Sequence, residues 1–270
     1  MPIWADPARG ERVRLLADDD LSLLATFVAP PAPRPTAADL RAVPGTDLDR
    51  LAQVAARDLP GVRVITRLDE ATALTEAGAT VIGSTVHMIR DRLQEDPPPL
   101  HWAGPHLAAG LVPVGVETVP EDDLAAAQLL AFGPGHVDHQ ATLEAQAAGQ
   151  LHALLAGELL GPLYTDASTA VLDPDGRVVA SLLATHWEGI GDEWSGGPWL
   201  VDLFTVPGAP LLLGRSLLAR AVAVASLDGH PAVGLTVSAT NRARRMYERL
   251  GFRDAFYRVT LDLPGDWPAP

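Results

Sequence analysis

A strand, a short loop and a helix in the last third of the chain predict a binding site for an anion. Residues 202–207 (DLFTVP) read as the end of a strand, and residues 208–213 lead into an apolar segment that begins GRSLLARA. The first turn of a helix presents backbone N–H groups that have no partner inside the helix, and the helix dipole adds partial positive charge. Small residues in the loop allow a pyrophosphate to approach the backbone.

The segment that follows resembles a known family. Residues 233–237 (VGLTV) read as a strand, and residues 241–252 read NRARRMYERLGF. This run resembles the part of GNAT N-acetyltransferases in which an Asn precedes Tyr-Glu-Arg-Leu-Gly-Phe. The strand that ends DLFTVP resembles the acetyl-CoA strand of that family. The resemblance is strongest over residues 199–263, and the order of elements extends it back to about residue 112.

The resemblance implies a role for each matching position. The backbone of Phe204, Thr205 and Val206 would hold the acetyl carbonyl and the pantetheine arm, in the slot where two strands part. Asn241 would bond the pantetheine or the segment beside it. The N–H groups that would cradle the pyrophosphate belong to Leu211, Leu212, Leu213, Gly214 and Arg215. The implied co-substrate is acetyl-CoA or another acyl-CoA.

Three residues are candidates for the proton transfers of acyl transfer to an amine. Tyr247 stands where the family places a phenol that protonates the departing thiolate, and a phenol with a pKa of roughly 10 can give a proton to a thiolate of similar basicity. Asp202 stands where the family often places a carboxylate that deprotonates the amine; the alternative is a structural hydrogen-bonding role. Glu188 is another candidate base, with His186 beside it, unless residues 186–194 form only an exposed acidic loop anchored by tryptophans.

The predicted phosphate loop departs from the family pattern, which is Gln or Arg, two residues, Gly, one residue, then Gly or Ala. Aligning Gly214 with the last position puts Ala209 at the basic position and Leu212 at the middle glycine. Pro210 also removes an N–H donor. Three functions therefore stay open: an N-acyltransferase acting on a small-molecule amine, an acyltransferase with an unusual or larger donor, and a catalytically silent CoA-binding or interaction protein.

The elements around these motifs predict an α/β fold with a mixed, mostly antiparallel central sheet flanked by helices. We expect residues 111–270 to form a GNAT-like acyl-CoA-binding domain. Its expected strands are 112–116, 168–172, 177–186, 199–206, 233–237 and 256–263, and its expected helices are 120–132, 140–160, 214–226 and 242–250.

Residues 1–110 are expected to form a separate partial GNAT-like or cap domain. Residues 62–66, 69–77 and 80–89 read as a strand, a helix and a strand, which resembles the end of the same fold. The sequence Glu76-Ala-Gly-Ala79 stands where Glu-Arg-Leu-Gly-Phe stands in the C-terminal part. The alternatives are a truncated second GNAT-like unit without its own cofactor loop and an unrelated α/β cap.

Composition limits the partners. The 34 acidic and 20 basic residues give a net charge of −14, which argues against nucleic acid or an anionic membrane as partner. This balance is compatible with a cationic amine, although acidity also serves solubility alone. The absence of cysteine excludes disulfides, thiolate metal sites and a cysteine nucleophile, and it fits a reducing cytoplasm.

No metal and no membrane association are expected. His136-Val-Asp-His139, with His152 downstream, has no zinc-site spacing and no clear fourth ligand. The N-terminus has no signal-peptide pattern, and no apolar run reaches the roughly 18 to 20 residues of a membrane helix. We therefore expect a cytoplasmic protein. A homodimer remains open, since dimers are common among proteins with this resemblance.

Overall fold

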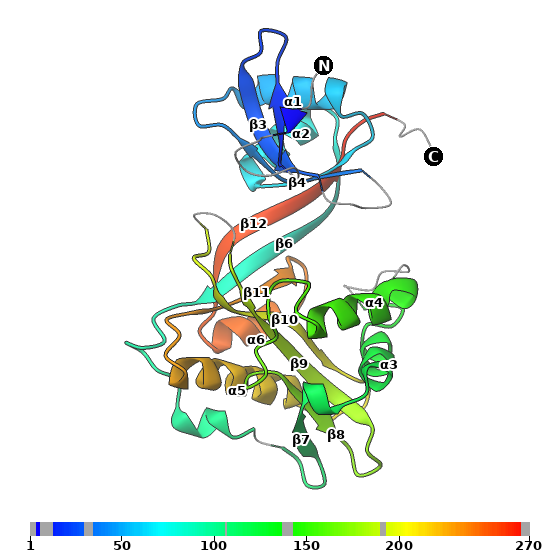
Figure 1. The fold of residues 1–270 in the computed structure, drawn as a ribbon, viewed down its shortest axis with the longest axis vertical. Helices are drawn as coiled ribbons and strands as arrows, with labels where there is room; N and C mark the ends of the chain where they lie inside the picture. The colour runs from blue at the N-terminus through cyan, green and yellow to red at the C-terminus, as the bar shows by residue number, and fades with distance from the viewer. Residues whose placement is uncertain are drawn as a thin grey trace. The chain divides into compact units, whose positions relative to one another are not determined.

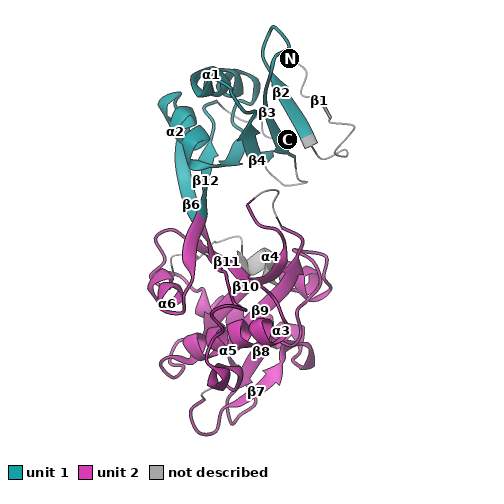
Figure 2. Cartoon of the chain, turned by 90° about the vertical axis from the view of Figure 1, so that its left-hand side faces the viewer, with its two compact units in different colours: residues 1–86, 256–270 teal, residues 87–255 magenta. Residues whose placement is uncertain are grey.

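The computed structural model describes residues 4–5, 13–29, 35–105, 107–136, 143–189 and 193–265. The chain forms two compact units (Figures 1 and 2): residues 1–86 with 256–270 make unit 1, and residues 87–255 make unit 2. This division differs from the boundary expected at residue 110. The reason is that two strands, β6 (Thr80–Arg90) and β12 (Arg253–Asp262), each carry residues of both units.

Unit 2 is built on strands in the order β6-β11-β10-β9-β8-β7. The pairs from β7 to β10 are antiparallel, and β10 pairs with β11 in parallel. The sequence-based expectation of a mixed, mostly antiparallel sheet is therefore confirmed. The bounds of these strands are β7 (Val112–Gly115), β8 (Thr169–Leu172), β9 (Val178–Trp187), β10 (Gly197–Thr205) and β11 (Val233–Ser238).

Helices cover both faces of this sheet. On one face, α3 (Glu121–Ala131) and α4 (Leu143–Leu155) contribute to an apolar cluster that includes Leu183 and Phe204. Side chains alternate along a strand, so the neighbours of Phe204 on β10, Leu203 and Thr205, point to the other face. There they lie against Gly214 in α5 (Leu213–Leu227). The remaining helical segments of the unit are α6 (Arg244–Arg249) and the 3₁₀ turns η1 (Leu100–Ala103) and η2 (Val116–Thr118).

Unit 1 has strands in the order β1-β2-β3-β4-β5-β12, continued by β6. The helices α1 (Leu48–Asp58) and α2 (Leu68–Glu76) pack on this sheet and share one apolar core with it. The strands β1 (Trp4–Ala5), β2 (Val13–Ala17), β3 (Leu23–Val28) and β4 (Thr36–Ala42) have no counterpart among the elements expected from the sequence; β5 (Arg63–Thr66) does. Residues 36–42 (TAADLRA) contain a single β-branched residue, and pairing with β3 and β5 makes them a strand.

The same turn follows β4 in unit 1 and β10 in unit 2. Val43–Gly45 and Val206–Gly208 both read Val-Pro-Gly, and the glycine of each turn has a positive φ, +84° and +86°. Each valine carbonyl accepts a hydrogen bond from the residue three positions on, at 3.0 Å from the Thr46 amide and at 3.1 Å from the Ala209 amide. A proline followed by a residue with positive φ is typical of a type II turn, which requires the glycine.

The helices α2 and α6 also end alike. The amide of Ala79 donates to the Leu74 carbonyl at 2.9 Å, and the amide of Phe252 donates to the Tyr247 carbonyl at 3.1 Å. The glycine before each amide has a φ of +98° and +89°, as in the common glycine-terminated helix end. By this correspondence Leu74 occupies in unit 1 the position that Tyr247 occupies in unit 2.

The strand order is symmetric about its centre. It reads β4-β5-β12-β6-β11-β10, and the outer pairs β4–β5 and β10–β11 are both parallel. The strand that follows α6 along the chain pairs with β5, at Val259–Asp262 against Arg63–Thr66. The strand that follows α2 lies beside β11. The strand beside β5 is therefore β12, which follows α6, and the strand beside β11 is β6, which follows α2.

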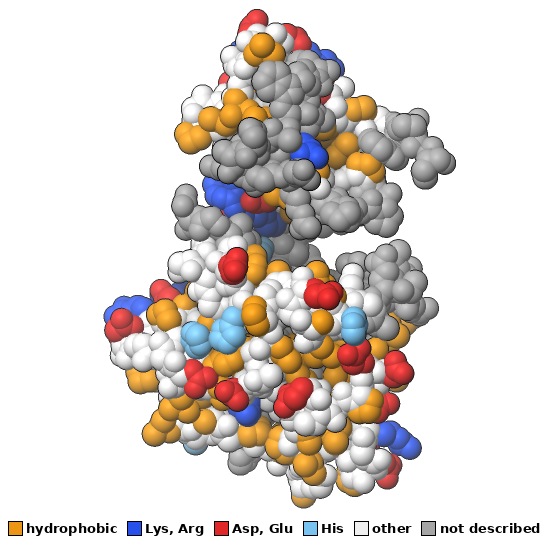
Figure 3. All heavy atoms as spheres, in the orientation of Figure 1, with side chains coloured by type: hydrophobic (Ala, Val, Ile, Leu, Met, Phe, Trp, Pro, Cys, Tyr) orange, Lys and Arg blue, Asp and Glu red, His pale blue; other side chains and the backbone are white. Residues whose placement is uncertain are grey.

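On the face shown in Figure 3, acidic side chains of residues 87–255 are spread as separate groups rather than gathered into one patch. Within the described ranges, no helix has the length and apolar character needed to cross a membrane.

Trp199 and Gly234 fix the end at which β10 and β11 pair, and this contact gives a first test. Trp199 is buried against Trp187 and Trp194, with ring centroids 4.7 and 5.2 Å away. A Cβ added at Gly234 would overlap the Trp199 indole, which has no room to move. We expect Gly234→Ala to lower the free energy of unfolding by about 1–3 kcal/mol, measured by urea denaturation. Gly83→Ala in β6, where the added atom meets open space, is the control, with a change below about 1 kcal/mol; equal losses would contradict the packing argument.

Candidate functional site

The parallel strands β10 and β11 separate partway along their length. Their register covers Trp199 with Gly234 and Leu200 with Leu235 and ends there. At the same point the register of β10 with β9 shifts between Leu200 and Asp202, which makes a bulge. A bulge bends a strand and interrupts its ladder. The bend and the end of pairing together open a slot between the two strands, as the resemblance implies.

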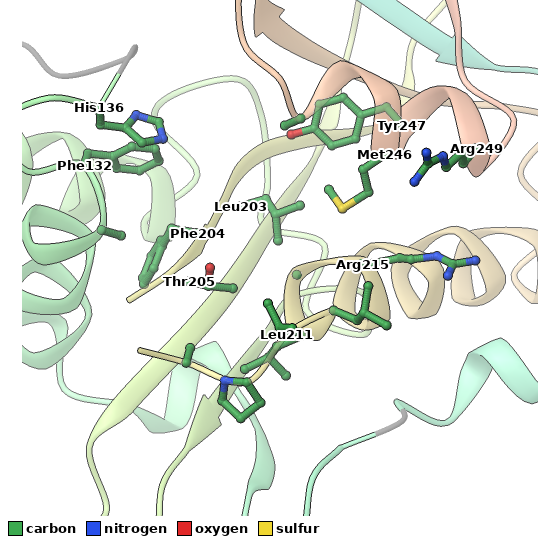
Figure 4. A pocket seen from close by; sticks show the side chains of 17 residues that line it. Phe132, His136, Leu203, Phe204, Thr205, Leu211, Arg215, Met246, Tyr247 and Arg249 are labelled. Carbon is green, nitrogen blue, oxygen red and sulfur yellow. The ribbon is translucent and has the colours of Figure 1, made fainter. Parts of the chain in front are cut away.

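A pocket of about 520 Å³ lies at the open end of this slot (Figure 4). It gathers many of the residues expected from the sequence, namely Phe204, Thr205, Leu211, Leu212, Leu213, Gly214, Arg215 and Tyr247. It also includes residues that the sequence reasoning did not single out for the cofactor, among them Phe132, His136, Leu203, Met246 and Arg249. Four separate segments of the chain therefore meet around one cavity.

The N-terminus of α5 opens into this pocket without a side-chain cap. Leu212 is the N-cap residue, with φ +69° and ψ 2°, and its side chain makes no capping hydrogen bond. The Ser216 amide closes the first helical turn on the Leu212 carbonyl at 2.9 Å. The amides of Gly214 and Arg215 precede that bond, so they belong to the N–H groups that helix geometry leaves without an intrahelical partner. These amides are the groups on which the predicted anion site depends, and the site itself stays a prediction.

Positive charge at the pocket comes from two helices rather than from the loop. Arg215 of α5 and Arg249 of α6 both line the pocket and are exposed, whereas Ala209 stands at the basic position of the loop. Among the described residues that line the pocket there is no Asp or Glu. Arg249 was missed, although the sequence carried a signal: five of the 20 basic residues fall within residues 242–253.

Tyr247 is held by α6 between the main pocket and a smaller cavity. Its side chain is 8% exposed and packs edge-on against Phe252, with ring centroids 6.3 Å apart. Asn241 shapes the start of α6, since its Oδ1 accepts a hydrogen bond from the Ala243 amide at 2.8 Å. In Figure 4 the Tyr247 hydroxyl points away from Arg249, toward the side of the pocket that carries His136.

Asp202 of β10 lines the smaller cavity and contacts α3. Its Oδ2 accepts a hydrogen bond from Gln128 Nε2 at 2.6 Å, which ties α3 to β10. Asp202, Thr236 and Tyr247 all line this cavity of about 30 Å³. A cavity of that size with polar partners accommodates about one water molecule. The structure thus brings two of the three candidate catalytic residues to one small polar space.

Three expected site residues lie elsewhere or are engaged. The Val206 amide donates to the Val179 carbonyl at 2.9 Å and continues the β-ladder, so it is not directed at a ligand. Asn241 lies outside the pocket lining and serves the turn into α6. Glu188 is exposed and follows the end of β9. Because Trp187 pairs with Gly197, the next residue, Glu188, lies beside the start of β10, about 16 Å along the strand from Asp202.

His186 belongs to a separate aromatic group. Its ring lies 4.4 Å from Tyr164 and 5.3 Å from His230, and the Tyr164 hydroxyl donates to Asp228. Burial, followed by this hydrogen bond, raises the pKa of Tyr164, while burial and the neighbouring His186 lower the pKa of His230. None of these residues lines the pocket beside α5.

His136 and His152 have separate surroundings in the part of the chain that the structure describes. There, no group of three or more His, Cys, Asp or Glu side chains is arranged to hold a metal ion. His136 packs edge-on against Phe132 at 4.9 Å, and His152 Nδ1 lies 3.1 Å from Glu121. His139 lies outside the described residues.

Solved structures share this fold. A GCN5-related N-acetyltransferase from Sphaerobacter thermophilus gives a TM-score of 0.61 at 17% identity, covering 96% of this chain and 84% of that one. An acetyltransferase of the GNAT family from Colwellia psychrerythraea gives 0.57 at 10% identity, covering 93% and 84%. A tandem GNAT protein from the clavulanic acid biosynthesis pathway gives 0.53 at 13% identity, covering 94% and 83%.

These similarities establish the fold of the chain. Neither protein-family models nor curated proteins match the sequence. The chain nevertheless has the fold of the GCN5-related N-acetyltransferases over nearly its whole length. In this chain Thr205 of β10, the N-terminus of α5 and Tyr247 of α6 line one pocket.

The backbone conformation of Leu212 provides a test of the loop. A residue with a side chain in the left-handed region costs roughly 1–2 kcal/mol, and a glycine there does not. The Leu212 side chain is 69% exposed, so little burial is lost on its removal. We expect Leu212→Gly to raise the free energy of unfolding by about 0.5–1 kcal/mol, measured by urea denaturation. Leu211→Gly, which removes a still more exposed side chain from a residue without a positive φ, should destabilise instead; the reverse order would refute the assignment of strain to Leu212.

Proposed function

We propose that the chain is an N-acyltransferase that moves an acyl group, in the simplest case acetyl, from an acyl-CoA to the amine of a small molecule. The observation that carries this proposal is the joining, in one pocket, of an uncapped helix N-terminus and Tyr247 at the open end of the strand slot. The helix end suits a pyrophosphate. The slot suits an extended arm, and Tyr247 stands beside the place where that arm ends.

The proposed reaction is direct transfer. The amine nitrogen attacks the thioester carbonyl, a C–N bond forms, and the C–S bond breaks. The amine loses a proton and the departing thiolate gains one, so the products are an amide and the free thiol. Backbone groups of Phe204 and Thr205 at the slot edge position the carbonyl. Most of the rate enhancement then comes from holding the two reactants in line.

Two residues would move the protons. Tyr247 would donate its phenolic proton to the thiolate. Asp202 would accept the amine proton through a water in the small cavity that both residues line. The hydrogen bond from Gln128 keeps the carboxylate oriented. Glu188 is less well placed for this role because it lies at the opposite end of β10.

We propose one acyl-CoA site per chain, and it lies in unit 2. Unit 1 repeats the turn, the helix end and the parallel strand pair, and we infer that it is a truncated second copy of the same fold. At the start of α1, however, Asp47 accepts hydrogen bonds from the amides of Asp49 at 3.0 Å and Arg50 at 3.5 Å. A carboxylate therefore occupies the place that a phosphate would take. Leu74 in place of a tyrosine removes the acid as well.

Donor binding tests the proposal first. Titration calorimetry with acetyl-CoA, a longer acyl-CoA and free CoA should give binding with a stoichiometry near one. Arg249→Ala should weaken binding about twofold to fivefold, because an exposed charge near a phosphate contributes up to about 1 kcal/mol. Arg253→Ala, an exposed arginine outside the pocket, is the matched control. Absence of binding by all three compounds would refute the proposal, and a stoichiometry of two would refute the single site.

Turnover separates the enzyme from a silent binding protein. That second candidate is motivated by Leu212 and Pro210, two residues of the loop that depart from the family pattern. Steady-state kinetics with a panel of amines should show thiol release, and Tyr247→Phe should lower kcat about 10- to 100-fold with donor KM changed less than threefold. Tyr257→Phe, a tyrosine away from the pocket, should keep full activity. Donor binding without turnover of any amine would favour the silent protein, and full activity of Tyr247→Phe would refute the acid.

A further inference from the structure

His87 is a buried titratable residue that the reaction described above does not use. It lies in the part of β6 that belongs to unit 2 and is 8% exposed. Its ring packs against the indole of Trp199, with the ring centroids 5.6 Å apart. Its Nδ1 lies 3.3 Å from the hydroxyl oxygen of Thr236. When the imidazole carries its proton on the other ring nitrogen, this hydroxyl donates a hydrogen bond to Nδ1.

Thr236 lies where the slot between the strands opens. It is the first residue of β11 beyond the last pair with β10, which joins Leu200 to Leu235. It lines the small cavity that Asp202 and Tyr247 also line. A hydroxyl can accept one proton while it gives another, so it can pass a proton on without changing its own charge. Thr236 therefore connects the water-sized cavity to the buried imidazole.

Unit 1 has different residues at the matching positions. The parallel pair of unit 1 starts at Arg63 of β5, and that of unit 2 starts at Gly234 of β11. The residue two positions further on is Ile65 in unit 1 and Thr236 in unit 2. Ile65 pairs with Thr260 of β12. An isoleucine has no group that can transfer a proton, so the path from slot to neighbouring strand is absent from this pair.

Counting from the glycine that ends the second helix gives the same correspondence. Thr260 lies nine residues after Gly251, and His87 lies nine residues after Gly78. Unit 1, which has Leu74 in place of a tyrosine, therefore also lacks the imidazole and the hydroxyl. These differences fall on residues that line or adjoin the small cavity of unit 2. This is expected if the residues serve one reaction.

Acyl transfer to an amine requires two protons to leave the nitrogen. An aliphatic amine is an ammonium ion near neutral pH, and only its neutral form attacks a thioester. One proton must leave before the attack, and a second leaves as the C–N bond forms. In the reaction described above Asp202 gains the second proton, and Tyr247 gives one to the thiolate beside the same cavity. These two residues leave the first proton without an acceptor.

We propose that Thr236 and His87 carry this first proton away from the ammonium group of the acceptor. The inference rests on the proposed function, because it needs an amine at the end of the slot. The ammonium gives a proton to a water in the small cavity, the water gives one to the Thr236 oxygen, and the Thr236 hydroxyl proton passes to Nδ1 of His87. The amine is then neutral, and the imidazolium returns its proton to solvent. An imidazole suits this task because it changes its charge near neutral pH. His87 acts through Thr236 and is a positioning residue.

The first test removes the hydroxyl of Thr236, which is exposed, so that its variants should fold. Steady-state kinetics uses acetyl-CoA and the panel of amines. Thr236→Val keeps the shape of the side chain and should lower kcat about tenfold or more, with donor KM changed less than about threefold. Thr236→Ser keeps a hydroxyl and should stay within about threefold of the wild-type kcat. Thr260→Val, which removes a hydroxyl from the matching strand pair of unit 1, is the control and should change neither constant.

The second test changes the imidazole. His87→Gln keeps a hydrogen-bonding group beside Thr236 but cannot carry the proton. It should lower kcat by the same factor as Thr236→Val and leave the affinity for acetyl-CoA, measured by calorimetry, unchanged. Because the two residues form one path, the double variant should lose no more than either single variant. The loss should be smaller for the weakly basic amines of the panel, which enter the site uncharged.

The outcomes separate this inference from the proposed function. An unchanged kcat for Thr236→Val, or losses that multiply in the double variant, would overturn the path. If His87→Gln lowers the affinity for acetyl-CoA by the same factor as kcat, the role of His87 is structural and the inference fails. Equal losses for strongly and weakly basic amines would refute the assignment of the first proton. In each of these cases the wild-type chain still turns over an amine and the proposed function stands, whereas a wild-type chain that turns over no amine ends both.

Discussion

The separation of β10 from β11 is the constraint on which the site depends. Two parallel strands must either pair along their length or find other partners for their backbone groups. Here Trp199 packed on Gly234 fixes the paired end, and the bulge between Leu200 and Asp202 turns β10 away. The free strand edge and the start of α5 then face the same space. A ligand with both a carbonyl and phosphates can use both features.

The electrostatics of the pocket follow from this arrangement. The chain is acidic overall, yet the described lining of the donor pocket carries two arginines and no acid. The loop itself is poor in donors because of Pro210 and carries a leucine in a conformation suited to glycine. The arginines of α5 and α6 supply the positive charge that the loop lacks. The family pattern in the loop is therefore weakened, and the positive charge beside the loop comes from the two helices.

The two units share three structural features but differ at the N-terminus of one helix. Both have the Val-Pro-Gly turn, a parallel strand pair and a glycine-ended second helix, and each is completed by a strand from the other segment. In unit 1 the helix end is closed by Asp47, and an apolar residue replaces the tyrosine. A cap of this kind typically contributes about 1 kcal/mol. The sequence difference between a leucine and an aspartate at the cap thus leaves the N-terminus of α5 without a side-chain cap and closes that of α1.

Local sequence determined much of unit 2, because its helices and strands carry clear periodicity and turn residues. Tyr247 to Phe252 and the strand into Val206 were sufficient to predict the fold, and the resemblance they carry named eight of the 17 residues that line the pocket. Pairing between distant segments could not be predicted from the sequence. The segment β4 lacks strand propensity and becomes a strand by pairing with β3 and β5. The strand β12 pairs with β5, which lies some 200 residues earlier in the chain. The contact of His87 with Thr236 was equally hidden, because the two residues meet only in three dimensions. Types and spacing of residues determined which chemistry is available, and tertiary packing decided that Asp202 and Tyr247 share one space while Glu188 does not.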